Sequence, residues 1–139
     1  MLINNTLWVT GGLDQSGKRL KTTELVTKEG KTSKGPDLPL ALRSHALVAL
    51  NSVVFILIGG HSGGLSLSSS ATYFYEEKKG WMPGPNLKNT RSYHTAGVLT
   101  DRVSTKQYIV AVGGYPARSS LEYLEYPGSN EWMQGKPTH

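Results

Sequence analysis

A diglycine that follows an apolar, β-rich run occurs three times in this sequence, and it limits the fold more than any other feature. The three pairs are Gly11-Gly12, Gly59-Gly60 and Gly113-Gly114, at separations of 48 and 54 residues. Regular spacing on this scale is typical of repeat architectures, in which each unit packs against the next. Further landmarks with the same period would therefore establish a structural repeat.

Other features repeat in step with the diglycines. His45 and His94 precede the second and third pairs and lie 49 residues apart. Trp81 and Trp132 follow the same two pairs at matching positions, where the first unit has Thr32. Because these separate landmarks share one period, we interpret them as a structural repeat.

Each full unit is predicted to contain four short strands and no helix. The run from Val53 to Ile58 is apolar without alternation, which indicates a strand buried on both faces, and Asn51-Ser52 before it is a plausible two-residue turn. A four-stranded antiparallel sheet of about 50 residues is typical of a β-propeller blade. We therefore predict an all-β fold with a partial blade over residues 1–40, its first strand missing or degenerate, and blades over 41–88 and 89–139.

The order of these landmarks resembles the Kelch-repeat propellers. The third unit carries Arg91-Ser-Tyr-His94, Gly113-Gly114, Glu122-Tyr123 and Trp132. The middle unit has Arg43-Ser-His45, one residue tighter, and the first unit lacks the Arg/His strand and the Trp. The resemblance implies an incomplete Kelch-type β-propeller of four-stranded antiparallel blades, because 139 residues supply fewer than the 4–8 blades that usually close a ring. The chain is then a piece of a longer propeller, or it self-associates to complete one.

The repeat assigns a structural role to ten residues. These are Gly11, Gly12, His45, Gly59, Gly60, Trp81, His94, Gly113, Gly114 and Trp132. The histidines recur at the start of the same strand in successive blades, so a hydrogen-bonded structural role is favoured over metal binding or catalysis.

Composition excludes several classes of function. The chain has no Cys, and therefore no disulfide, thiolate nucleophile or Cys-based metal site. The longest apolar stretch is too short to cross a bilayer, and the first residues do not form a signal peptide, so we expect no membrane partner and a cytoplasmic rather than secreted protein. The net charge of +5 is scattered, which argues against nucleic-acid binding.

Local motifs do not predict catalysis. The segment from Gly12 to Lys18 matches part of a phosphate-binding loop, but Arg19 replaces the required Ser or Thr and a strand is expected to follow. The serine-rich stretch 66–70 has no activating base, and Glu76-Glu77 would point to opposite faces of a strand. We therefore predict no catalytic residue, no cofactor and no metal.

The Kelch resemblance implies a protein-interaction module. Such propellers mostly present loops to partner proteins, often as substrate-recognising parts of ubiquitin-ligase adaptors or as cytoskeletal binders. The residues implied in partner contacts are Leu13, Arg43, His61, Arg91 and Tyr115, although either arginine could instead tie neighbouring blades together. The alternatives are a fragment of a propeller enzyme or sugar-binding protein whose active site lies in missing blades, and a truncated product without independent function.

Overall fold

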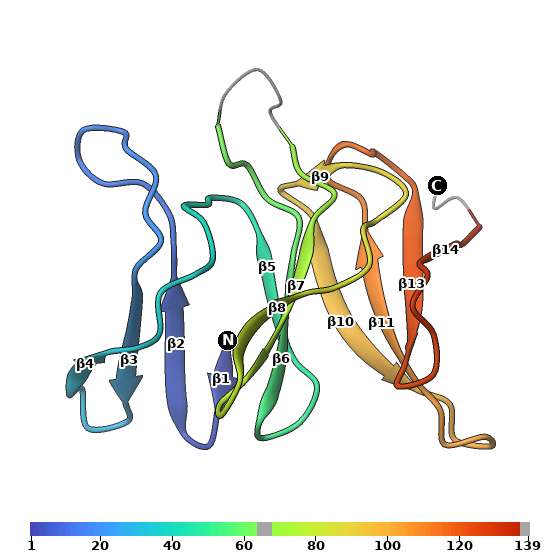
Figure 1. The fold of residues 1–139 in the computed structure, drawn as a ribbon, viewed down its shortest axis with the longest axis horizontal. Helices are drawn as coiled ribbons and strands as arrows, with labels where there is room; N and C mark the ends of the chain where they lie inside the picture. The colour runs from blue at the N-terminus through green and yellow to red at the C-terminus, as the bar shows by residue number, and fades with distance from the viewer. Residues whose placement is uncertain (64–67, 137–139) are drawn as a thin grey trace.

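The computed structural model describes residues 1–63 and 68–136, and its strands form an arc of three upright sheets (Figure 1). Each of these three sheets has four antiparallel strands in sequence order. The first sheet contains β1 (Leu2–Ile3), β2 (Thr6–Thr10), β3 (Thr23–Thr27) and β4 (Thr32–Lys34). The second contains β5 (Ala46–Ala49), β6 (Val54–Ile58), β7 (Thr72–Glu76) and β8 (Gly80–Pro83). The third contains β10 (Thr95–Thr100), β11 (Gln107–Val112), β13 (Leu121–Tyr126) and β14 (Met133–Gln134).

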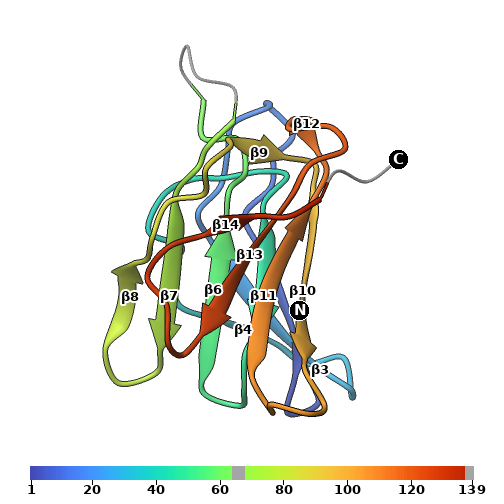
Figure 2. The same cartoon turned by 90° about the vertical axis from the view of Figure 1, so that its right-hand side faces the viewer.

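These sheets are the blades of an incomplete β-propeller, so the predicted fold class is confirmed. A short extra pair, β9 (Arg91–Ser92) with β12 (Tyr115–Pro116), lies at the upper end of the third blade (Figure 2). The first blade keeps two residues of its first strand as β1, which turns into β2 through Asn4 and Asn5. Both asparagines have positive φ, as a tight hairpin turn requires.

The middle blade is buried on both sides, as its continuous apolar strand predicts. All five residues of β6 are buried. Ile56 and Ile58 pack with Ile109 of the third blade, whereas Leu57 on the opposite face packs with Leu42 from the connection after the first blade. Alternation of side chains along one strand therefore supplies the core on both sides.

The hairpin before β6 is longer than the expected two-residue turn. Val53 is 51% exposed, and the strand begins at Val54. The side-chain oxygen of Asn51 accepts hydrogen bonds of 2.9 Å from the backbone N–H groups of both valines. This cap takes up donors that would otherwise extend the ladder, so the turn covers residues 50–53.

The first glycines of the first two diglycines, Gly11 and Gly59, form the joints to the next blade. Gly59 has a φ of 60°, and a Cβ built on it would lie 2.5 Å from the Arg91 carbonyl oxygen and 3.0 Å from Cε1 of His94. Gly11 makes the equivalent close approach to the Leu42 carbonyl and to His45. Only glycine combines this left-handed conformation with room for the neighbouring backbone.

Hydrogen bonds from other repeat residues also cross between blades. The N–H groups of Gly12 and Gly60 donate to the carbonyls of Leu42 and Arg91, at 2.8 and 2.7 Å. Nε1 of Trp132, which is fully buried, donates to the Pro85 carbonyl at 3.0 Å. Trp81 makes the corresponding bond, 2.9 Å, to the carbonyl of Asp37. Each tryptophan is therefore fixed to the segment that leaves the preceding blade.

Within residues 1–63 and 68–136, no helix is long and apolar enough to span a bilayer.

Candidate functional site

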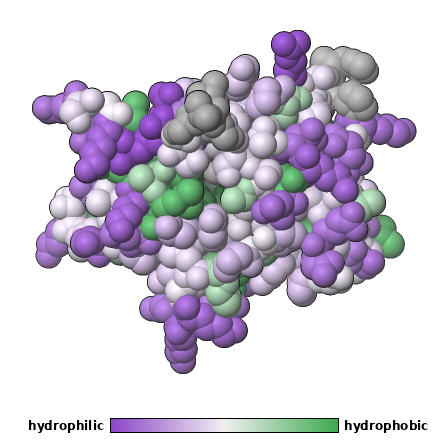
Figure 3. Space-filling model, turned by 45° about the horizontal axis from the view of Figure 1, so that its top comes forward, coloured by the Kyte–Doolittle hydropathy of each residue, from purple (hydrophilic) through white to green (hydrophobic). Residues whose placement is uncertain are grey.

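The segments that follow the three diglycines lie at the same end of the three blades, at the top in Figure 1. We call this the loop end. It comprises residues 13–22, 61–63, 68–71 and 115–120, with the entries to the second and third blades at 43–45 and 91–94. With this end brought forward, hydrophilic side chains flank a less polar middle (Figure 3). The predicted partner-contact residues all belong to this end of the molecule.

Two of them, Arg43 and His61, pair through their backbones, and His61 also contacts a third residue, Arg19. The backbones of Arg43 and His61 form a bridge, with N···O distances of 3.2 and 2.8 Å. Nε and Nη2 of Arg19, from the first blade, lie 3.1 and 2.7 Å from Nδ1 of His61. The withdrawal of His61 from solvent, and then the charges of Arg19 and Arg43, lower its pKa below the usual range. The neutral imidazole can therefore accept a hydrogen bond from Arg19 through Nδ1.

This cluster carries positive charge that the described residues do not neutralise. Among them, no carboxylate forms an ion pair with Arg19 or Arg43. Asp14, in the same loop as Arg19, accepts hydrogen bonds from Ser16 and Lys18, and these bonds lower its pKa. Its carboxylate closes its own turn, and strand β3 follows. The interpretation as a turn, rather than a phosphate loop, agrees with this geometry.

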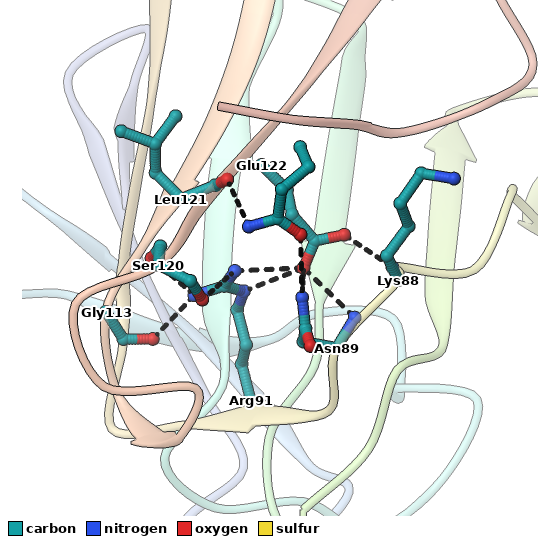
Figure 4. Close-up of polar contacts among 8 residues, drawn as sticks. Lys88, Asn89, Arg91, Gly113, Ser120, Leu121 and Glu122 are labelled. Carbon is teal, nitrogen blue, oxygen red and sulfur yellow. Dashed lines mark hydrogen bonds and ion pairs between the residues drawn. The ribbon is translucent and has the colours of Figure 1, made fainter. Parts of the chain in front are cut away.

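Arg91 is placed differently, with its side chain fully buried against Glu122 (Figure 4). Nε and Nη2 of the arginine lie 3.1 and 2.9 Å from Oε2 of the glutamate. Nη1 donates to the carbonyls of Gly113 and Ser120, at 2.8 and 2.9 Å. Glu122 also accepts from the backbone N–H groups of Lys88 and Asn89.

These contacts correct the expectation of a partner contact at Arg91. A partner cannot reach a guanidinium whose donors are all directed inward. The backbone of Arg91 also accepts from Gly60 and donates to Ser69, at 2.7 and 2.9 Å, which links the second and third blades. The geometry at Arg91 therefore supports a role in holding neighbouring blades together.

Tyr115 and Leu13 are accessible, as a contact role requires, and Tyr93 joins them. Tyr115 is 54% exposed and Tyr93 is 64% exposed. Ser68 holds the backbone beneath Tyr115, with its Oγ 2.9 Å from the Tyr115 carbonyl and 2.8 Å from Oγ of Ser92. The tyrosine ring therefore projects from a fixed backbone. Residues 66 and 67 of the serine-rich stretch lie outside the described residues.

Sequence reasoning missed Arg19 and Tyr93. Arg19 gave no repeat signal, because the loops after the diglycines differ in length and sequence. Tyr93 offered one, since it directly precedes the repeated His94 at the place where the second blade has Ser44. Tyr93 and Ser44 have positive φ values of 57° and 56°, so this position recurs as a turn at the loop end.

The two histidines occupy equivalent joints but differ in their hydrogen bonds. Nε2 of His45 lies 2.8 Å from Oγ1 of Thr10, whereas both ring nitrogens of His94 are buried and have no hydrogen-bond partner among the described residues. The residue before the diglycine is Thr10 in the first blade and Ile58 in the second, so His94 meets no hydroxyl there. The expected hydrogen bond holds for His45 and does not hold for His94.

The surroundings of these histidines keep them neutral. Burial lowers the pKa of His45, and burial followed by the charges of Arg91 and His45 lowers the pKa of His94 to about 4. No group of three or more His, Asp or Glu side chains is placed to hold a metal ion within the described part of the chain.

Comparisons with known proteins inform the fold alone. No protein-family model matches this sequence, and no curated protein matches it. Solved structures do match, among them the structure of YjhT, with a TM-score of 0.76 and 12% sequence identity. The match covers 99% of this chain and 53% of that one, so the chain spans about half the length of YjhT.

Proposed function

We propose that this chain is a non-catalytic protein-interaction module of the Kelch type, which binds a partner protein at the loop end. The observation that carries the proposal is the arginine pair Arg19 and Arg43, without a carboxylate partner among the described residues, at the same end as exposed Tyr93 and Tyr115. Arginine and tyrosine are among the side chains enriched at energetically important interface positions. The order of arginine, histidine, diglycine and tryptophan in the blades supports the Kelch assignment.

A binding role fits better than catalysis because the ionisable side chains that are withdrawn from solvent are built into the packing of the blades. Arg91 and Glu122 bind each other with no exposed surface, and His94 is packed against Gly59. A general acid or base must reach its substrate within hydrogen-bond distance. These three side chains instead stabilise contacts between strands and blades.

A second copy of the chain is included among the partners that we propose. Leu7 and Val9 of β2 are about half exposed, so the first blade presents apolar side chains to solvent. Because the chain spans about half of YjhT, two copies together have about the length of that protein.

The proposal predicts that partner capture depends on the loop end. In a pull-down from lysate with the tagged chain as bait, Tyr115→Ala and Arg43→Ala should each reduce the captured partner protein about tenfold, as expected for loss of an interface anchor. Val103→Ser is the matched control, because Val103 is exposed in the loop at the opposite end of the third blade. Equal capture by all the variants would refute binding at the loop end.

A further inference from the structure

A hollow lies between the first and second blades, at the end of the blades opposite the loop end. Its volume is about 330 Å³, within the range of sites that hold small ligands. Turns at the lower ends of the strands contribute Asn4 and Ser52 to its lining, and Glu77 follows β7. This site is separate from the surface of the proposed function and does not depend on it.

Three aromatic side chains form the body of the hollow. Phe55 is buried, with its ring 4.9 Å from that of Trp8 at 70° and 5.7 Å from that of Tyr75 at 13°. Trp8 and Tyr75 are only partly buried, and their ring centroids lie 6.2 Å apart with the planes inclined at 60°. Phe55 and Tyr75 therefore form a stacked pair, and Trp8 lies steeply inclined to both of them.

The packing of the blades does not itself require these aromatic residues. Trp8 and Ile56 each lie three residues before a diglycine, and Phe55 and Ile109 each lie four residues before one. Tyr75 pairs with Phe55 as Leu124 pairs with Ile109. In the joint between the second and third blades, the aliphatic residues at these places are closed into one buried core. The first joint therefore has an open aromatic site where its counterpart is filled.

The charge in the hollow is negative. Glu77 is the one charged residue among those that line it, and no basic side chain of the described residues forms an ion pair with Glu77. Neighbouring Glu76 is instead paired with Lys79 at 2.9 Å. Aromatic faces attract cations through their quadrupole, and a carboxylate at the rim adds to that attraction.

We propose that this hollow binds an organic cation with a trimethylammonium group. Such a group has a low cost of leaving water compared with a primary ammonium, and it presents methyl surface to Trp8 and Tyr75 while its charge faces Glu77. The group can come from a small solute or from a trimethylated lysine side chain, and the test separates these two sources.

The test uses choline and its neutral isostere 3,3-dimethylbutan-1-ol, with the indole N–H signal of Trp8 followed by NMR during titration. Choline should shift this signal saturably and bind at least about fivefold more tightly than the isostere, because only choline gains the cation–π attraction. A short peptide with trimethyllysine is titrated in parallel. Tighter binding by the peptide would assign the site to a protein ligand, and tighter binding by choline would assign it to a solute.

Variants distinguish binding of choline in the hollow from nonspecific binding elsewhere on the protein. Glu77→Gln should weaken choline binding about threefold or more, whereas Glu76→Gln, the matched loss of a carboxylate that is already paired, should leave it unchanged. Tyr75→Leu copies the third blade and should abolish binding. Equal affinity for choline and its neutral isostere, or no effect of Glu77→Gln, would overturn the proposal. Glu77 is exposed, so Glu77→Gln should leave the packing of the core unchanged, and a loss of affinity then reports on the site itself.

Discussion

Glu122→Gln is expected to destabilise the 139-residue chain by about 3–5 kcal/mol, the usual cost of leaving a buried charge without its partner. The substitution keeps the size of the side chain and removes its charge, so the buried guanidinium of Arg91 loses its counter-ion. The amide also replaces an acceptor oxygen with a donor, near the N–H groups of Lys88 and Asn89. Urea unfolding followed by circular dichroism measures the change.

The control is Glu131→Gln, which removes a glutamate from an exposed pair with Lys88 at 3.2 Å. Exposed pairs contribute little, so this change should cost less than about 1 kcal/mol. The double variant Arg91→Met with Glu122→Gln should cost clearly less than the two single changes added together, because neither charge is then left alone. Equal small costs for Glu122→Gln and Glu131→Gln would show that the buried pair is not formed.

Acidification is expected to destabilise the chain through His94. Its pKa is about 4 in the folded chain and close to 6.5 when unfolded, so between these values the unfolded state binds more protons. The contribution of the neutral imidazole to the free energy of unfolding is complete above about pH 6.5 and is lost as the pH falls toward 4. At about 1.4 kcal/mol per pKa unit, this loss amounts to about 3 kcal/mol.

His94→Gln isolates this contribution, because it removes the titrating group while carboxylates and the other histidines titrate as before. The free energy of unfolding, measured from pH 7 to pH 4, should fall less steeply in the variant than in the parent chain. Parallel curves for the two proteins would contradict the burial of a neutral His94.

The period of the diglycines predicted the blades because each landmark marks a strand position that local sequence also favours. It predicted that Gly59 and His94 are structural, but their mutual contact joins residues of different blades and becomes visible only when the blades pack. The missing hydrogen bond of His94 was in principle readable, because Ile58 stands where the first blade has Thr10.

Arg91 and Arg43 show why the candidate site was only partly predictable. Both begin their blades in similar motifs, but the strand position that holds Glu122 in the third blade holds Tyr73 in the second. Arg91 therefore pairs with a carboxylate, whereas Arg43, whose Nε is also buried, forms no ion pair among the described residues. The hydrogen bond between Arg19 and His61 joins loops of the first two blades. These loops differ in length, so the repeat does not align their residues and could not predict the contact.

The hollow at Trp8 also escaped prediction, for a related reason. Aromatic residues at these positions suit a half-buried strand as well as a ligand site. Only the comparison of two packed joints, one open and aromatic and the other closed and aliphatic, separates these roles.

The central claim, that the first two diglycines are joints to the following blade, is tested most directly by the free energies of unfolding of Gly59→Ala and Gly113→Ala. The two glycines hold equivalent places with φ of 60° and 68°, so the backbone strain of an added Cβ is matched. At Gly59 the Cβ would meet the carbonyl of Arg91 in the next blade, whereas at Gly113 it would meet only the carbonyl of Arg118, at 3.1 Å. Gly59→Ala should therefore cost about 1–3 kcal/mol more than Gly113→Ala. Equal costs would contradict the joint.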